Sequence, residues 1–471
     1  MQQKKIYFVS LGCVKNRVDS EVMLGVATRE GFALSSDADA ADVIVVNTCG
    51  FIGEAKRESV ETVLELAELK EHGQCKKLVV TGCLAQRYPG ELASEMPEVD
   101  HFLGSSDMLK LANVLRDETN ERMLVGNPAD WVIRASDPRV LTESQASAYV
   151  KIAEGCNRTC SFCVIPQMRG KQRSRLADDV VAEVEQLVDQ GVREILLISQ
   201  DTVSYGRDLP ASERTKLADL VERVANVRGV HWVRLFYLYP ENLDAKLLDV
   251  VANHPRMVKY VDMPLQHASD TMLTRMRRGH GKDRQRRVVD RLKNAIPNLA
   301  FRTAFIVGHP GETDAEFDEL CEFVTWAEFD HVGVFRYSDE ESCRSFTQDE
   351  KVPTRVAASR YRKLMGLQRK IARARNKARI GSELEVLVEG VSEEHEFVMK
   401  GRHEGQAPDV DGQVYLSGSD VRAGSFVRVQ ISQASDYDLV GEVIEPVRTR
   451  PVHKRRITLP VLGTRSAQKW Q

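Results

Sequence analysis

The chain has 471 residues, of which 42% are hydrophobic and 29% charged, and its net charge is −3. This composition fits two or three globular domains and gives no overall sign of nucleic-acid or membrane binding. The N-terminal apolar run is too short for a signal peptide, and no run reaches the roughly 18–20 residues of a membrane span. We therefore expect a cytoplasmic protein whose nine cysteines are thiols or metal ligands rather than disulfides.

Residues 1–130 are predicted to form a first domain in which short apolar runs alternate with helical patterns. This alternation predicts a parallel α/β sheet, in which ligands gather at the carboxyl ends of the strands. A loop-rich linker is expected at 126–145. The predicted strands are 5–12, 41–50 and 76–83, and the predicted helices are 17–32 and 55–72.

Residues 142–375 are predicted to form a second series of roughly six βα units. We expect a barrel or partial barrel with its active site at the C-terminal ends of the strands. A basic helix is predicted at 355–381. The predicted strands after the first are 192–201, 230–240, 258–267, 299–312 and 329–341.

Residues 378–447 change in pattern to short strands separated by turns, which predicts a small all-β barrel of OB-like type. The basic residues 448–471 are expected to form a flexible tail.

Three cysteines crowd into one short stretch, where Cys156, Cys160 and Cys163 have the spacing C-x3-C-x2-C. A structural zinc site usually takes four ligands from two knuckles, and no second knuckle is present. Three thiolates suit a four-iron cluster with one open iron, which can bind the methionyl group of S-adenosylmethionine (SAM) for radical formation. Zinc or buried free thiols are the alternatives.

A second set of cysteines, Cys13, Cys49 and Cys83, follows three strands of the first predicted sheet. Loops at one edge of a parallel sheet can converge, so these thiolates are candidates for a second cluster. On spacing alone, ordinary buried cysteines are an equally good interpretation. The other three cysteines, which receive no role, are Cys75, Cys321 and Cys343.

The stretches "LGCVKNRVDSE", "NTCGFI", "TGCLAQRYPGEL" and "EGCNRTCSFCVIPQMRG" resemble the radical-SAM methylthiotransferase family, and the resemblance covers about residues 5–447. It implies an auxiliary four-iron cluster on the first-domain cysteines, a SAM-binding cluster on the barrel cysteines and a final TRAM domain. It also implies the use of two SAM molecules, a sulfur donor and a reductase that supplies electrons. The reaction would attach a methylthio group to an unactivated C–H bond.

The substrate implied by "NTCGFIGEAKRES" and "ISQDTVSYGRDL" is the β-carbon of an aspartate in ribosomal protein S12 (uS12), because both stretches resemble that branch of the family. The alternative is a transfer-RNA adenosine. Residues 381–445 hold 14 Asp and Glu against 4 Lys and Arg, a net charge of −10, which suits a basic ribosomal protein better than RNA. Alternatively, these acidic residues form a solvated surface without a binding role. The basic helix and tail favour contact with ribosomal RNA instead.

Four residues are candidates for contact with SAM. Phe162 is expected near the adenine or simply in the core, and Gln200 ends a barrel strand and faces the expected site. Gly308 and Gly311 permit either close approach of the backbone or a tight turn. His309 receives no chemical role, and no catalytic residue is expected beyond the cluster ligands. A rival of a different class is a zinc-stabilised protein that binds RNA or the ribosome without catalysis.

Overall fold

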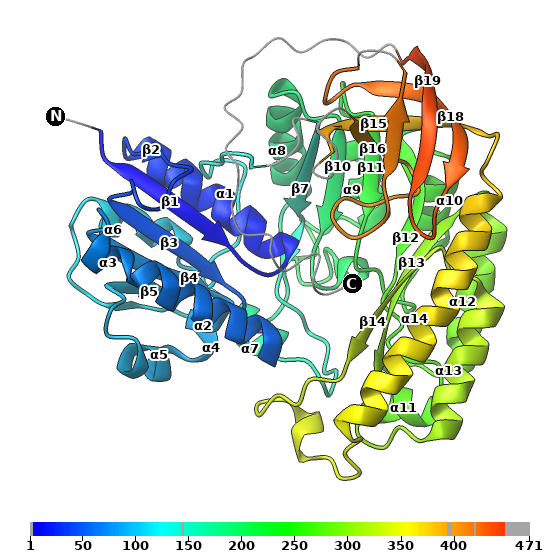
Figure 1. Cartoon of the computed structure of the whole chain (residues 1–471), viewed down its shortest axis with the longest axis horizontal. Coiled ribbons are helices and arrows are strands. Elements are labelled where there is room, and N and C mark those ends of the chain that lie inside the picture. The colour runs from blue at the N-terminus through cyan, green and yellow to red at the C-terminus, as the bar shows by residue number, and fades with distance from the viewer. Residues whose placement is uncertain (1–2, 143–145, 393–397, 419–420, 448–471) are drawn as a thin grey trace.

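The structure is a computed structural model that describes residues 3–142, 146–392, 398–418 and 421–447. It contains two parallel sheets and one closed barrel, which follow one another along the chain (Figure 1). No helix among these residues is long and apolar enough to cross a membrane. The expected tail at 448–471 lies outside the described residues.

The first sheet has six parallel strands in the order β2-β1-β3-β4-β5-β6. The strand order reverses between β1 and β3, which makes the carboxyl ends of these strands the expected ligand site of a doubly wound sheet. The strands are β1 (Lys5–Ser10), β2 (Ala33–Leu34), β3 (Val43–Thr48), β4 (Lys77–Gly82), β5 (His101–Leu103) and β6 (Met123–Leu124). The helices are α1 (Val14–Arg29), α2 (Gly53–Ala67), α3 (Leu69–His72), α4 (Cys83–Arg87), α5 (Pro89–Glu95) and α6 (Leu111–Leu115).

The second sheet also has six parallel strands, in the order β14-β13-β12-β11-β10-β7, and it is open, so it forms a partial barrel. The strands are β7 (Ser147–Lys151), β10 (Glu194–Ile198), β11 (Trp232–Leu235), β12 (Met257–Asp262), β13 (Ala300–Val307) and β14 (His331–Arg336), with a small ribbon of β8 (Ala153–Glu154) and β9 (Arg173–Ser174). The helices are α7 (Ile165–Arg169), α8 (Ala177–Asp189), α9 (Leu217–Asn226), α10 (Ala245–Asn253), α11 (Asp270–Arg275), α12 (Lys282–Ala295), α13 (Asp314–Ala327) and α14 (Thr354–Lys377).

The two faces of this second sheet have different partners. Val233 and Leu235 belong to the apolar core shared with the surrounding helices. Trp232 and Tyr260 face the other way, where they pack with Val18 of α1 and with the third domain. The concave face of the partial barrel is therefore filled by segments that lie far away in the sequence.

The third domain is a closed five-stranded barrel in the order β15-β16-β17-β19-β18, which confirms the predicted all-β module. Strand β16 has no alternating apolar pattern, so no local feature of the sequence indicates it. The strands are β15 (Glu383–Val391), β16 (Met399–His403), β17 (Val414–Ser417), β18 (Phe426–Ala434) and β19 (Leu439–Pro446).

A buried ion-pair cluster fixes the third domain against the second sheet. The Glu194 carboxylate accepts hydrogen bonds from Arg402 of β16 at 2.7 Å and from Arg234 of β11 at 3.1 Å. Burial alone would raise the pKa of Glu194, but the two guanidinium groups outweigh it and lower this pKa to about 2. The carboxylate is therefore ionised, and both cations are needed to offset its desolvation.

The first domain contacts both edge strands of the second sheet. At one edge α1 lies beside β7, and at the other the loop after β14 meets the first domain through Glu340. Glu340 forms ion pairs with Lys56 of α2 at 2.7 Å and with Arg87 of α4 at 2.8 Å. The first domain thus spans the open side of the partial barrel (Figure 1).

Removal of one cation from the Glu194 cluster tests how the third domain is held. Arg402→Ala is expected to cost about 3–5 kcal/mol, because a buried carboxylate loses one of its two guanidinium partners. Scanning calorimetry should show a lower temperature of unfolding. Arg428→Ala is the matched control in the same barrel, since the ion pairs of Arg428 with Glu383 at 3.5 Å and with Glu445 at 3.4 Å are exposed. We expect at most about 1 kcal/mol there, and equal shifts for both variants would contradict the analysis.

Candidate functional site

The loops that follow β1, β3 and β4 converge and bring Cys13, Cys49 and Cys83 together. Two glycines permit this approach. Gly12 has a φ of +89°, and a Cβ added to it would lie 3.0 Å from the Cys49 sulfur. A Cβ at Gly50 would lie 2.7 Å from the Cys83 carbonyl oxygen. Side chains at these positions would push the loops apart, so the glycines allow the three thiols to share one place, the first triad.

The cysteines of the first triad affect one another electrostatically. Burial raises the pKa of Cys49, and repulsion from Cys83 and Cys13 raises it further. Burial also raises the pKa of Cys83, although the Arg169 guanidinium opposes this effect. As thiolates these three cysteines would repel one another, and a metal cluster would supply the positive charge that offsets this repulsion.

The second triad, Cys156, Cys160 and Cys163, lies in the loop between β8 and α7, beyond the carboxyl end of β7. The loop is folded on itself, because the Cys163 N–H donates to the Cys160 carbonyl at 3.3 Å. Burial raises the pKa of Cys163, and repulsion from Cys160 and Cys156 adds to it. Burial likewise raises the pKa of Cys156 to about 11, against the effect of a hydrogen bond from the Arg158 N–H. These thiols also share one small volume.

Several donors point at sulfur atoms of the two triads. The Arg158 N–H lies 3.4 Å from Cys156 Sγ, and Arg278 Nη1 lies 3.3 Å from Cys160 Sγ. In the first triad, Arg169 Nε lies 3.3 Å from Cys83 Sγ. Hydrogen bonds to sulfur stabilise the thiolate and tune the potential of an iron–sulfur cluster. The donor set therefore fits clusters on both triads.

The geometry also bears on the zinc alternative. Within the described ranges, no three His, Cys, Asp or Glu side chains are arranged to hold a single metal ion. A structural zinc site usually takes four protein ligands, whereas each triad has three cysteines.

A buried charge network connects the two triads. Arg169, which ends α7, donates to Asp19 of α1 at 2.7 Å and to Asn16 at 2.5 Å in addition to its contact with Cys83. Asp19 also accepts from Lys151, whose ammonium donates to Glu154 at 2.6 Å. Because Glu154 precedes Cys156 by two residues, this network fixes the position of one triad relative to the other.

Two of the predicted SAM contacts lie beside the second triad. Phe162 is half-buried at the edge of the second domain's core. Gln200 follows β10 and donates through its amide to Glu154. Its Oε1 and the Oδ1 of Asp201 are buried and accept no hydrogen bond from any described residue. Such orphaned acceptors suit the hydroxyl and amine donors of a bound nucleoside or amino acid.

Gly308 and Gly311 lie in a turn after β13. Both have positive φ, of +78° and +83°. A Cβ on Gly308 would lie 2.5 Å from the Cβ of Ala357 in α14, and one on Gly311 would overlap the guanidinium of Arg275. The turn and its packing explain both glycines without a ligand, and their contact with SAM stays a prediction.

His309, to which no chemical role was assigned, supports the loop of the second triad through a chain of hydrogen bonds. Its Nε2 lies 2.8 Å from the Ser345 hydroxyl, which donates to the hydroxyl of Ser161 at 2.8 Å. Ser161 stands between Cys160 and Cys163. Burial lowers the pKa of His309 to about 4, so the ring is neutral and serves as a hydrogen-bonding strut.

The remaining cysteines have different surroundings. Cys343 is buried in a small apolar cluster with Cys83 and Met168, and its charge also acts on Cys163. It therefore lies between the two triads, which its polar sequence context did not indicate. Cys75 is buried in the apolar core of the first domain, where its sulfur donates to the Lys77 carbonyl at 3.4 Å, and Cys321 is half-buried on α13.

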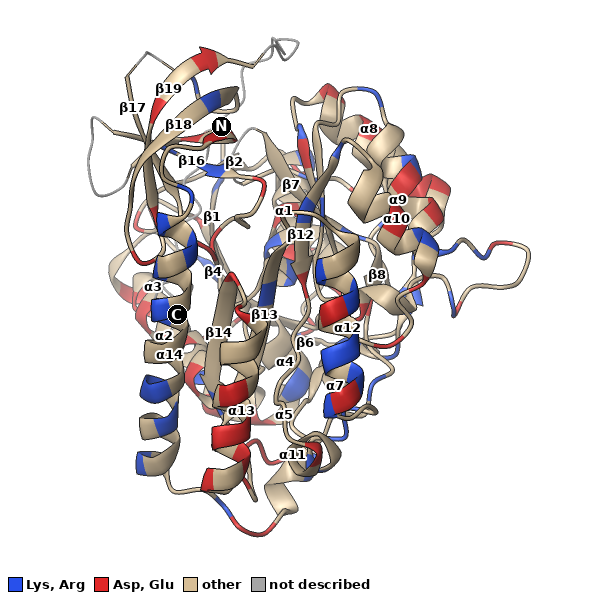
Figure 2. Cartoon of the chain, turned by 90° about the vertical axis from the view of Figure 1, so that its right-hand side faces the viewer, with Lys and Arg blue, Asp and Glu red and all other residues tan. Residues whose placement is uncertain are grey.

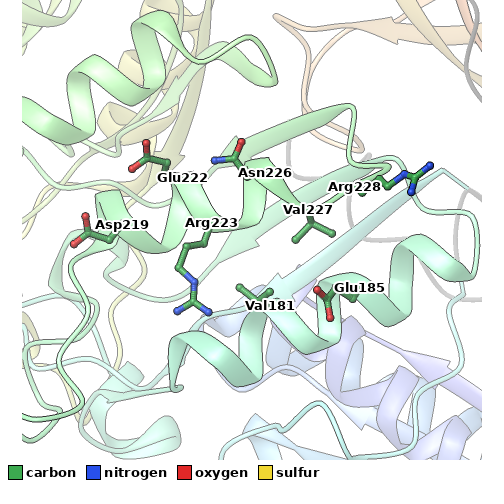
Figure 3. Close-up of a pocket in the computed structure, with 8 residues that line it drawn as sticks. All are labelled: Val181, Glu185, Asp219, Glu222, Arg223, Asn226, Val227 and Arg228. Carbon is green, nitrogen blue, oxygen red and sulfur yellow. The ribbon is translucent and has the colours of Figure 1, made fainter.

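Figure 3 shows a surface hollow between α8 and α9, whose lining includes Asp219, Glu222 and Arg223. The two acidic residues pair with Lys246 at 2.6 and 3.0 Å. The hollow is on the helical exterior of the second domain and contains no cysteine, so it is separate from the candidate site.

Sequence reasoning missed the polar residues that surround the triads. Asn16 and Arg169 stand inside the quoted cysteine motifs and were available as candidates. Tyr239 and Arg278, which contact Cys160, come from distant loops. No local pattern identified these two, because only the fold brings them to the cluster loop.

Comparison with known proteins gives full-length relatives. The chain is 64% identical to a protein of Sorangium cellulosum named ribosomal protein uS12 methylthiotransferase RimO, with 100% of each chain covered. It is 48% identical to a protein of the same name from Myxococcus xanthus, with 96% of this chain and 94% of the other covered.

Family and structure comparisons agree with the three domains. Residues 5–104 match an uncharacterized protein family termed UPF0004, residues 150–324 the radical SAM superfamily and residues 380–444 the TRAM domain. A solved radical S-adenosylmethionine methyltransferase, TsrM from Kitasatospora setae, is similar with a TM-score of 0.50 at 15% identity, over 71% of this chain and 73% of the other. At that identity the likeness concerns the fold alone.

The link between the triads can be tested at Arg169. Arg169→Met is expected to destabilise the protein by about 3 kcal/mol, because Asp19 and Asn16 lose a buried donor. Arg169→Lys keeps the positive charge, but the lysine ammonium lacks the planar guanidinium that reaches all three acceptors. An intermediate loss of stability is therefore expected. Thermal unfolding measures both. Arg173→Met is the control, since Arg173 donates to backbone carbonyls and makes no ion pair among the described residues. A larger loss there than at Arg169 would contradict the prediction.

Proposed function

We propose that this chain, which belongs to the family of ribosomal protein uS12 methylthiotransferases, attaches a methylthio group to the β-carbon of an aspartate in uS12. It is a radical-SAM transferase, and its family implies a four-iron cluster and SAM. The observation that carries the proposal is the full-length identity of 64% to a relative of that name.

We extend the proposal to two clusters, one on each triad. Cys156, Cys160 and Cys163 would hold the cluster that binds SAM, and Cys13, Cys49 and Cys83 the auxiliary cluster. When bound, these groups supply a radical that removes hydrogen and a methylthio group that replaces it. The support is that cysteines within each triad repel one another and that hydrogen-bond donors face a sulfur atom of each triad.

The roles of the chain's own side chains follow from their positions. Gln200 and Asp201 would accept hydrogen bonds from SAM through their orphaned oxygens, and Phe162 would pack beside the adenine. Arg169 holds the two triads in register through Asp19. The proposed reaction also requires a sulfur donor and a reductase.

We propose that uS12, free or in the ribosomal subunit, approaches along the acidic third domain. Ribosomal proteins are basic, and the net charge of −10 over residues 381–445 is complementary to such a partner. The basic helix α14 is less available for RNA than its sequence suggests. Figure 2 shows its Lys and Arg beside the acidic α13, where Arg360 pairs with Asp314 and Lys363 with Asp318 at 2.8 and 2.9 Å.

The substrate is tested by the intact mass of uS12 from cells with and without the gene. The proposal expects uS12 to lose the mass of one methylthio group in the deletion strain and to regain it on complementation. An unchanged uS12, together with loss of a methylthio group from transfer-RNA adenosine, would overturn the proposal in favour of the RNA substrate.

The two-cluster proposal is tested by iron analysis of anaerobically reconstituted protein. Replacing either triad with alanines is expected to halve the iron and sulfide, from about eight to about four of each per chain. Cys75→Ala is the control, because this buried cysteine belongs to neither triad, and it should keep the full content. Full iron after loss of the first triad would contradict a cluster there, and zinc in place of iron would contradict both.

A further inference from the structure

Lys15 is a buried lysine that the proposed reaction has not used. Its side chain begins two residues after Cys13, in the first turn of α1. Only 8% of its surface is exposed, and its Nζ lies 2.9 Å from the centre of the Tyr237 ring. An ammonium above an aromatic face is attracted by the ring, by about 2 kcal/mol when water is excluded.

The ring does not satisfy the ammonium, which carries three N–H donors. Among the residues that the structure describes, Lys15 donates no hydrogen bond and forms no ion pair. Lys151 shows the usual solution, since it is fully buried and forms ion pairs with Asp19 and Glu154. A buried cation without an acceptor is costly, so Lys15 is a site prepared for an anion.

The nearby carboxylates are already committed to other donors. Asp262 accepts from Arg302 at 2.8 Å and from the Tyr237 N–H at 3.0 Å. Glu154 accepts from Lys151 and from Gln200. They act on Lys15 only through space, as does Cys13, which the proposed auxiliary cluster would engage. None of these groups gives the ammonium a hydrogen-bond acceptor, which leaves that place to a ligand.

The position of Lys15 identifies that partner. It is next to the first triad through Cys13, and it lies over Tyr237, just beyond the carboxyl end of β11 in the second sheet. Its electrostatic neighbour Glu154 leads into the second triad. A carbon that must be reached from both triads has to lie in this region.

We propose that Lys15 binds the side-chain carboxylate of the target aspartate, with the Tyr237 ring holding the ammonium in place. This inference rests on the proposed function. The β-carbon is bonded directly to the carboxylate carbon, so an ion pair at Lys15 fixes the C–H bond that reacts. Lys15 then contributes to specificity, because the asparagine side chain and the adenine base carry no negative charge.

The test is the affinity of reconstituted full-length enzyme for uS12, measured by calorimetry, against uS12 in which asparagine replaces the target aspartate. Wild-type enzyme is expected to prefer the aspartate form by about tenfold or more, as for a charged hydrogen bond. In Lys15→Met this preference should vanish, and Lys15→Arg should retain part of it. Lys171→Met, an exposed lysine near the second triad, is the matched control and should keep the wild-type preference.

Equal weakening of both uS12 forms in Lys15→Met would overturn the inference, because it would indicate a structural role. A change in SAM affinity with the aspartate preference intact would also overturn it, since the anion would then be the SAM carboxylate. Iron content establishes that each variant is loaded. If Lys15→Met fails to load, complete loss of the preference in Lys15→Gln supports the inference and its retention overturns it. A wild-type enzyme that modifies uS12 without any aspartate preference sinks this inference alone, whereas one that leaves uS12 unmodified sinks the proposed function as well.

Discussion

Asp19 accepts hydrogen bonds from two cations of the second domain, Arg169 and Lys151, in a place closed to solvent. Each cation also donates a hydrogen bond at one triad. Arg169 donates to Cys83 of the first triad, and Lys151 donates to Glu154, which precedes the second triad. On the proposed function, two halves of a radical reaction would have to meet on one carbon, and small displacements of reacting groups cost large factors in rate. The fixed separation of the triads depends on this one carboxylate.

Such buried ion pairs are expensive, and well-packed apolar residues are often as stable. What the charges provide instead is a single arrangement. The same device recurs at Glu340, where Lys56 and Arg87 meet the far edge of the second sheet, and at Glu194, beneath the third domain. Each buried carboxylate is stable only in the arrangement of the domains that places its cations beside it. The three domains therefore dock in one orientation.

The sequence predicted most of the helices and strands that have a local repeating pattern of apolar residues. Runs such as Val43–Thr48 are buried on both faces, and the cysteines after β1, β3 and β4 follow directly from parallel strands. The two-residue strands β2 and β6 are too short for any period, and the partners Glu194 and Arg402 are 208 residues apart. Lysines such as Lys15 and Lys151 resemble surface residues in the sequence. Their burial is a property of the docked domains, which no window of sequence contains.

The third domain also has a consequence for movement. Arg402 reaches under the second sheet, and Phe426 packs against Trp232 with ring centres 4.8 Å apart. The third domain is therefore held in a fixed position, and it does not swing to carry a bound substrate inward. On the proposed function, the target aspartate would then have to sit at the tip of a loop that projects from its own protein far enough to pass the third domain. Reach would join charge as a criterion of selection, and a flat or recessed acidic residue would be refused however well its surroundings matched.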